Sequence, residues 1–138
     1  AKRTIQVEVI VFKIINNEIL FLLLKRTNER GGFWQPITGG VHKGENLSQA
    51  VDRELLEETG ITEYIRKIND VYYFEFNAND HKLLKEHVFG IEISPNIAVK
   101  ISPEHTEIKW CTLNESLALL KYETNKTGFK KLFTLLND

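Results

Sequence analysis

Three glutamates within five residues, Glu54, Glu57 and Glu58, are the part of this sequence most able to do chemistry. On a helix, at 100° per residue, their side chains fall within about 100° of arc, so the three carboxylates crowd one another. Like charges four residues apart destabilise a helix, and acids in its last turn oppose the negative end of the macrodipole, each by some tenths of a kcal/mol. The simplest compensation is one or more divalent cations, most commonly magnesium, held by these oxygens.

The sequence predicts that these acids lie on a helix from Leu47 to Thr59. Asn46 and Gln49 have the types and spacing of a capping box, and a glycine follows the last residue. The apolar stripe of this helix, continued at the 3.6-residue period, reaches Glu54 and Glu58, so carboxylates occupy core-facing positions. A solvated, glutamate-rich helix face is the alternative interpretation, but it leaves the neighbouring residues unexplained.

The residues before these acids add to the pattern. Arg53 can pair with one of the carboxylates and lower its pKa through the nearby positive charge. Gly39, Gly40 and Gly44 lie in the loop that leads into the helix, where they would let the backbone approach a ligand closely. Glu45 follows the last of these glycines. The whole stretch therefore predicts a site built from a glycine-rich loop and an acidic helix.

Gly39, then five residues, Glu45, then seven residues and the run 53–61 (RELLEETGI) resemble a complete Nudix box, the signature of the Nudix hydrolases. The resemblance implies an α/β/α sandwich with a central mixed β-sheet, and the strands expected on either side of the box fit that architecture. A chain of 138 residues has the length of one domain, so residues 1–138 are expected to form a single Nudix hydrolase domain.

The resemblance also implies roles for these residues. Glu54 and Glu58 would be the main metal ligands, Glu57 would bind the metal or orient a water, and a main-chain carbonyl near Gly39 would complete the set. Glu45 and Arg53 would fix the helix against the loop. The implied cofactor is magnesium (Mg2+), with manganese (Mn2+) as a substitute, because a polyanionic diphosphate needs charge neutralisation and an activated water.

The family often adds one more acid from a later loop. Glu104 is the candidate here for a catalytic and metal-binding role, because it precedes a strand predicted to end near Trp110. Glu107 and Glu86 are its rivals, and an exposed loop charge without function is the alternative for Glu104.

Nudix enzymes hydrolyse a nucleoside diphosphate linked to a further group. The run 33–39 (FWQPITG), together with Glu104, His105 and Trp110, is similar to the dihydroneopterin triphosphate pyrophosphatase branch, which also hydrolyses deoxynucleoside triphosphates. The expected reaction is therefore hydrolysis of a (deoxy)nucleoside or dihydroneopterin triphosphate to monophosphate and pyrophosphate. A diadenosine polyphosphate hydrolase is the alternative, and a nucleotide-binding Nudix-like domain without catalysis is another.

The candidates for substrate binding lie around the glycine-rich loop. Trp34 could stack on a purine or pterin, although a buried structural tryptophan is equally expected, and Gln35 lies beside it. Arg26 ends a strand just before the loop, where its guanidinium could hold distal phosphates in bidentate fashion. The backbone at Gly39 and Gly40 completes this set.

Composition narrows the classes of partner. A formal net charge of -1 provides no general positive field, so strong nucleic-acid binding is not expected and the partner should be a small nucleotide or pterin triphosphate.

The single cysteine, Cys111, cannot form an internal disulfide and suits a core thiol in a reducing compartment. No apolar run reaches the length of about 20 residues that spans a bilayer, so a cytoplasmic location is expected. The four histidines lack metal-ligand spacing, and nothing indicates an oligomeric state.

The remaining elements follow from alternation, turn residues and helical spacing. Asn16 and Asn17 indicate a tight turn, and the glycine-rich stretch 27–44 should be an irregular loop around a short strand. Strands are expected over 4–13, 18–25, 64–76, 85–93 and 107–112, with a polar turn at 77–82, and helices over 113–120 and 127–136.

Overall fold

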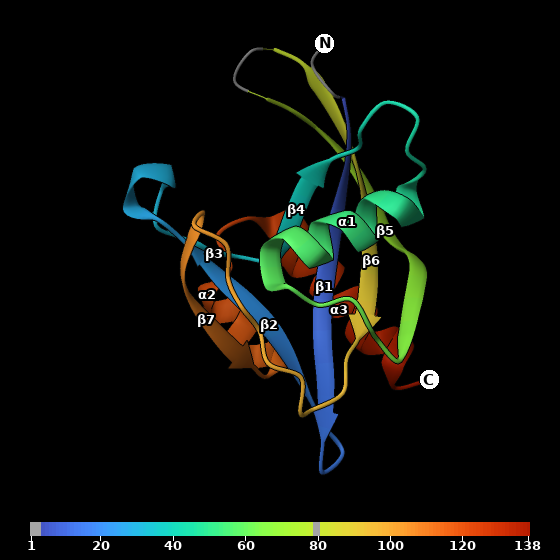
Figure 1. Ribbon diagram of the computed structural model, residues 1–138, viewed down its shortest axis with the longest axis vertical. Helices are drawn as coiled ribbons and strands as arrows, with labels where there is room; N and C mark the ends of the chain where they lie inside the picture. Colours follow the sequence, from blue (N-terminus) through green and yellow to red (C-terminus); the bar gives the residue numbers. More distant parts are fainter. Residues whose placement is uncertain (1–3, 79–80) are drawn as a thin grey trace.

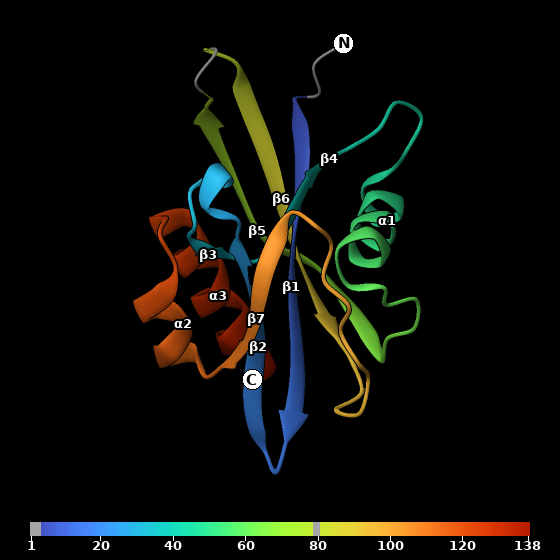
Figure 2. The ribbon, with the colours of Figure 1, turned by 60° about the vertical axis from the view of Figure 1, so that its left-hand side comes forward.

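The computed structural model describes residues 4–78 and 81–138. A seven-stranded sheet separates helix α1 on one face from α2 and α3 on the other, which confirms the expected α/β/α sandwich (Figures 1 and 2). The elements in chain order are β1 (Ile5–Ile15), β2 (Glu18–Arg26), the 3-10 turn η1 (Asn28–Arg30), β3 (Trp34–Gln35), β4 (Ile37–Gly40), α1 (Leu47–Thr59), β5 (Arg66–Asn77), β6 (Leu83–Glu92), β7 (His105–Cys111), α2 (Leu113–Leu119) and α3 (Glu123–Leu136).

Strand β1 is the centre of the sheet and changes partner along its length. The strand order is β3-β2-β1-β6-β5, with β4 also paired to β1 and β7 to β2. The β1–β6 pair is parallel and the other pairs are antiparallel, so the sheet is mixed as expected. One half of β1, at 6–9, pairs with β4, whereas the other half, at 12–15, pairs with β2. Strand β4 and its glycines therefore lie directly beside β1 under α1.

The alternation along β1 divides the core into two layers, because successive side chains of a strand point to opposite faces. Val7, Val9 and Val11 are buried in the layer that packs against α1. Ile10 and Phe12 are buried in the layer beneath α3. Both faces of β1 are covered, so Glu8, which lies between Val7 and Val9, is buried in the core.

Helix α1 begins at Leu47 and ends at Thr59, as predicted. The Asn46 side chain accepts a hydrogen bond from the backbone N–H of Gln49 at 2.8 Å, and the Gln49 side chain accepts one from the N–H of Asn46 at 2.9 Å. Gly60 ends the helix with a φ of 74°, a left-handed conformation that favours glycine. The local capping residues were sufficient to define both ends.

The boundaries agree with the prediction to within two residues except at the start of α3, and three of the differences have a structural cause. Helix α3 begins at Glu123, not at residue 127, because its first turn is polar and is held by tertiary contact through Asn125 instead of by an apolar stripe. Strand β7 begins at His105, two residues early, through its pairing with Arg26. The stretch 27–44 holds two short strands instead of one, since β3 pairs with β2 and β4 with β1.

The β5–β6 hairpin is present as expected, and residues 79 and 80 of its predicted turn lie outside the described part of the chain. Within residues 4–78 and 81–138, none of the helices combines the length and the apolar character needed to cross a membrane.

Candidate metal and substrate site

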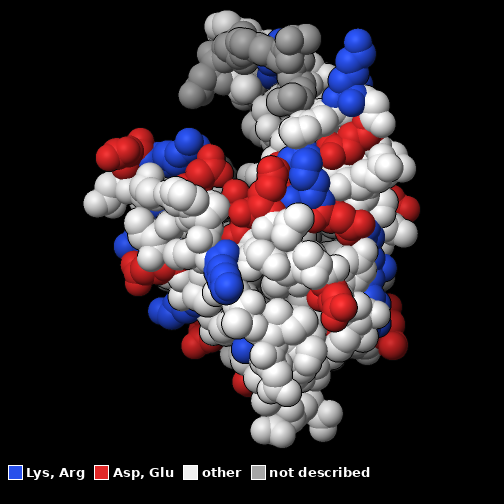
Figure 3. All heavy atoms as spheres, viewed as in Figure 1, with Lys and Arg blue, Asp and Glu red and all other residues white. Residues whose placement is uncertain are grey.

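Helix α1 turns two of its three clustered carboxylates toward the sheet. Glu54 and Glu58 are only 9% and 7% exposed, as the helical period predicted, whereas Glu57 is exposed. Figure 3 shows acidic side chains gathered over α1, on the face of the molecule that Figure 1 presents to the viewer. The site is therefore a partly buried carboxylate cluster, with Glu54 and Glu58 inside and Glu57 at the surface.

Arg53 binds the acids that surround it through one guanidinium group. Its Nη1 donates to Glu54 Oε1 at 2.8 Å and to Glu57 Oε1 at 2.7 Å. Its Nε and Nη2 donate to the two carboxylate oxygens of Glu45 at 2.7 and 3.0 Å, and Nη2 also donates to the Gly40 carbonyl oxygen at 2.7 Å. Arg53 therefore offsets part of the repulsion between Glu54 and Glu57.

Arg53 also fixes the loop that precedes α1. Its hydrogen bonds lower the pKa of Glu45 to about 2, so this carboxylate remains ionised under all ordinary conditions. The second partner of Glu45 is the backbone N–H of His42, which donates at 2.8 Å. Loop, strand β4 and helix α1 are therefore joined by a single network.

Gly39 lies directly against one of the buried carboxylates. A Cβ atom at this position would lie 2.0 Å from Glu54 Oε1 and 2.1 Å from its carboxyl carbon, which is a severe overlap. The pairing of Gly39 with Val7 on β1 fixes the backbone there, so it cannot easily move away. Only glycine leaves room for the Glu54 carboxylate.

The two buried carboxylates differ in electrostatics. Burial raises the pKa of Glu54, with Glu57 and Glu58 adding to the rise, although Arg53 acts in the opposite sense. Burial also acts to raise the pKa of Glu58, but contacts from His105 and Ser102 outweigh it and leave that pKa below its usual value. Ser102 Oγ donates to Glu58 Oε2 at 3.0 Å, and His105 Nδ1 lies 2.9 Å from the same oxygen.

Sequence reasoning did not predict His105 and Ser102 as parts of the site. They lie on either side of Glu104, which was expected to join Glu58 at the site, but no local pattern relates Ser102 or His105 to Glu58, because the Ser102–Glu58 hydrogen bond spans 44 positions. Only the register of β7 against β2 brings them together.

Glu104 lies at the rim of the cluster. Its carboxylate is about half exposed, pairs with Arg30 at 3.0 Å, and lies close enough to Glu58 to influence the pKa of that residue. Its rivals lie elsewhere: Glu107 pairs with Lys25 at 3.6 Å, and Glu86 is buried in the layer beneath α3. The structure thus brings Glu104, but not its rivals, to the carboxylates of α1.

The predicted substrate-binding residues are divided between the two faces of the sheet. Gln35 Nε2 lies 3.1 Å from His105 Nε2, on the side of α1. Trp34 packs into the layer beneath α2 and α3, so its ring does not adjoin the carboxylates. The Arg26 guanidinium lies 5.4 Å from the centre of the Phe33 ring and has no carboxylate partner within the described residues.

The donor set fits a hard divalent cation, although it does not enclose one. In the described part of the chain, no group of three or more acidic, histidine or cysteine side chains is arranged so that it could hold a metal ion by itself. In that same part, no hydrogen-bond donor reaches Glu54 Oε2 or Glu58 Oε1. Magnesium and similar ions take such carboxylate oxygens and keep several waters. Glu57 could join them by turning away from Arg53, since its side chain is exposed.

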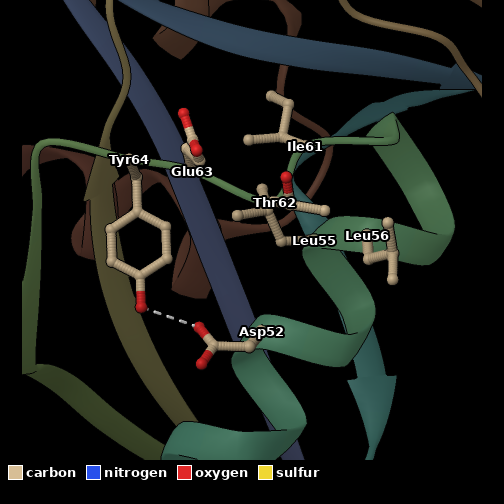
Figure 4. A pocket seen from close by; sticks show the side chains of 7 residues that line it. All are labelled: Asp52, Leu55, Leu56, Ile61, Thr62, Glu63 and Tyr64. Carbon is tan, nitrogen blue, oxygen red and sulfur yellow. Dashed lines mark hydrogen bonds between the residues drawn. The ribbon is translucent and has the colours of Figure 1, made fainter.

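A separate pocket lies at the C-terminal end of α1, away from this cluster. Figure 4 shows it between the helix and the segment 61–64, with the Tyr64 hydroxyl donating to Asp52 at 2.9 Å. Its lining is largely apolar and brings no set of catalytic groups together. The carboxylate cluster therefore remains the candidate site.

Comparison with known proteins identifies the family of this chain. Residues 4–133 match the family model described as NUDIX domain. The asymmetrical bis(5'-nucleosyl)-tetraphosphatase of Rattus norvegicus is 29% identical over 121 residues, which are 86% of this chain and 82% of that protein. An octanoyltransferase of Myxococcus xanthus is 33% identical over 126 residues, 91% of this chain, and the chain spans only 35% of its length. The dihydroneopterin triphosphate pyrophosphohydrolase of E. coli superimposes with a TM-score of 0.82 at 25% identity, covering 99% of this chain and 98% of that one. The chain belongs to the Nudix hydrolase family.

Proposed function

We propose that this protein hydrolyses a phosphoric anhydride bond in a nucleotide-like substrate with the help of a divalent cation, preferably magnesium. The observation that carries the proposal is the carboxylate cluster of α1. Arg53 gathers Glu54 and Glu57, Gly39 leaves room for Glu54, and Glu58 is held from the β7 side. Three acids kept together at an energetic cost to the helix are expected of a site selected for function, not for stability.

Each residue has a distinct task in this proposal. A bound cation neutralises phosphate charge and activates water for attack. Glu54 and Glu58 hold the cation through their free oxygens, and the exposed Glu57 either joins them or orients a water. Arg53 keeps Glu54 and Glu57 in place by hydrogen bonds at 2.8 and 2.7 Å. Glu104, at the rim, would contact the water or the cation in this proposal.

The preferred substrate is a (deoxy)nucleoside or dihydroneopterin triphosphate, cleaved to monophosphate and pyrophosphate. The similarity to the E. coli dihydroneopterin triphosphate pyrophosphohydrolase over nearly the whole of both chains supports it. Hydrolysis of diadenosine polyphosphates is the alternative, which the rat tetraphosphatase supports. A domain that binds nucleotides without cleaving them is less consistent with three retained acids. A cytoplasmic location, where such substrates are found, belongs to the same proposal.

Arg26 is the proposed contact to the distal phosphates. Arg30, Arg53 and Arg66 each pair with a carboxylate, whereas Arg26 has none within the described residues. An unpaired guanidinium can bind a phosphate in bidentate fashion. Its strand position opposite His105 places it next to the segment that holds Glu58. The role of Trp34 as a base-stacking residue remains a prediction that requires the substrate to reach the layer under α2.

The test is a product analysis. The protein is incubated with magnesium and a panel of nucleoside triphosphates, dihydroneopterin triphosphate and diadenosine tetraphosphate, and the products are separated by chromatography. Monophosphate plus pyrophosphate is the expected outcome, lost in excess chelator and in Glu58→Gln but kept in Glu63→Gln, an exposed control. Cleavage of diadenosine tetraphosphate alone would support the alternative, and turnover that survives chelation would reject the mechanism.

A further inference from the structure

His105 connects helix α1 with strand β3 through its two ring nitrogens. It is the first residue of β7, and its side chain is only 4% exposed. Its Nδ1 lies 2.9 Å from Glu58 Oε2, and its Nε2 lies 3.1 Å from Gln35 Nε2. A buried imidazole held between an amide and a carboxylate has little freedom to rotate.

The donor directions along this connection can be assigned. The Gln35 amide nitrogen can only donate, so it leaves Nε2 of His105 as the acceptor. The ring proton then belongs on Nδ1, the nitrogen that faces Glu58. Nδ1 makes no hydrogen bond of good geometry in the described structure, but Glu58 Oε2 lies 2.9 Å from it and is the acceptor available to its proton. A small rotation of the Glu58 carboxylate would bring Nδ1–H and Oε2 into hydrogen-bonding geometry.

Ser102 acts on the same carboxylate oxygen. The Ser102 hydroxyl oxygen accepts a hydrogen bond from the backbone N–H of Glu104 at 3.3 Å and donates to Glu58 Oε2 at 3.0 Å. Because a backbone N–H cannot accept, the hydroxyl proton is left for Glu58. Oε2 is thus approached by two donors from the β7 side, while Oε1 has no donor within the described residues.

We propose that Gln35 and His105 are positioning residues that, together with Ser102, fix Glu58 so that it offers a cation Oε1 alone. The inference rests on the proposed function and deepens it. It also gives Gln35 a role different from substrate contact, since its amide is used to orient His105. Strand β3 holds Gln35 in place by pairing it with Leu24.

The size of the effect follows from the behaviour of residues that orient metal ligands, whose loss typically weakens metal affinity about 10- to 100-fold. His105→Leu removes the ring and should weaken binding of Mn2+ by that factor in substrate-free protein. His105→Asn keeps an amide donor near the place of Nδ1 and should recover most of the affinity. Gln35→Leu should cost less, about threefold to tenfold, because the imidazole remains.

The experiment measures free Mn2+ by electron paramagnetic resonance in titrations of the whole chain, with melting curves to confirm that each variant is folded. Thr106→Val, at the exposed neighbour of His105, is the matched control and should bind as the wild type does. Because Gln35 acts through His105, the double variant Gln35→Leu/His105→Leu should bind no more weakly than His105→Leu alone.

The inference is overturned by full affinity in folded His105→Leu, by His105→Asn binding as weakly as His105→Leu, or by additive losses in the double variant. Nitrogen-15 spectra of the histidine rings provide a readout that needs no metal. The wild type should carry the His105 proton on Nδ1, and a proton found only on Nε2 would refute the assignment even if the protein bound no cation. Absence of Mn2+ binding by the wild type with the proton on Nδ1 would instead count against the proposed function.

Discussion

Glu8 and Glu86 form a buried carboxyl pair on the face of the sheet opposite α1, and this pair should make folding take up a proton. They lie on the adjacent parallel strands β1 and β6 and are 0% and 4% exposed. Burial raises the pKa of both groups, and for Glu8 the nearby Glu86 adds to the rise. Asn125 Nδ2 donates to Glu8 Oε1 at 2.7 Å, which leaves Oε2 to carry the proton that Glu86 accepts.

The sign and size of the pH dependence of stability follow from the linkage between folding and proton binding. In the unfolded chain both groups titrate near the ordinary value of 4.5, whereas the folded pair keeps a proton above it. The stabilisation is therefore complete below pH 4.5 and is lost as the pH rises through the raised pKa. One retained proton corresponds to about 1.4 kcal/mol per pH unit over the range in which the folded pair stays protonated. For a domain of this size that is a fall in Tm of roughly 4 °C for each pH unit within that range.

Glu8→Gln tests this reasoning. The new amide oxygen can accept from Asn125 and its NH2 group can donate to Glu86, so the pair no longer needs the shared proton. Melting curves from pH 5 to 9 should show a shallower loss of stability in Glu8→Gln than in the wild type, by about one proton. Glu18→Gln changes an exposed glutamate and should follow the wild type. Identical pH slopes for wild type and Glu8→Gln would refute the shared proton.

Three further predictions concern the carboxylate cluster. Gly39→Ala should displace the Glu54 carboxylate, since the new Cβ would lie 2.0 Å from its Oε1, and should lower turnover by about 100-fold or more; a rate within twofold of wild type would contradict the steric argument. Arg53→Lys should reduce the free energy of unfolding by about 1–3 kcal/mol in urea titrations, because lysine cannot bind three carboxylates at once. The same variant should lose its acid resistance, because the Glu45 pKa of about 2 gives stability above pH 4.5 that disappears as the pH falls toward 2, and an unchanged acid midpoint would count against it. Magnesium at a hundredfold excess over its Kd should stabilise the wild type by about 2.7 kcal/mol in thermal melts, and Glu54→Gln/Glu58→Gln should lose that rise; a rise of equal size would place the cation elsewhere.

The parts of the site that depend on local sequence were predicted well. Both ends of α1 follow from its capping residues, and the inward direction of Glu54 and Glu58 follows from the helical period. Pairing of Arg53 with one neighbouring acid was also expected. The resemblance also implied that Glu45 and Arg53 join the helix to the loop, whereas the hydrogen bond from Arg53 to the Gly40 carbonyl was not expected, because it depends on how the loop folds back over the helix.

The contacts between distant segments could not be predicted. His105 reaches Glu58 only because β7 pairs with β2 in a register that has an irregularity beside Arg26. The Glu8 and Glu86 carboxyls meet because β1 and β6 are parallel, which a single sequence does not reveal. The alternation of apolar and polar residues along a strand normally places charged residues in solvent. A buried pair such as Glu8 and Glu86 is therefore a contact that sequence patterns describe poorly.

The division of β1 between two partners has a consequence for how this protein could acquire new specificities. Strands β3 and β7 reach the rest of the sheet only through β2, which pairs with β1 at residues 12–15, whereas β4 and α1 are attached to the other half of β1. Residues such as Arg26 and Trp34 therefore lie on a separate limb from the Arg53 network. Substitutions at Arg26 or Trp34 can therefore change which molecule is bound while the Arg53 network keeps its geometry, whereas His105 connects the limb directly to Glu58 and is expected to tolerate less change.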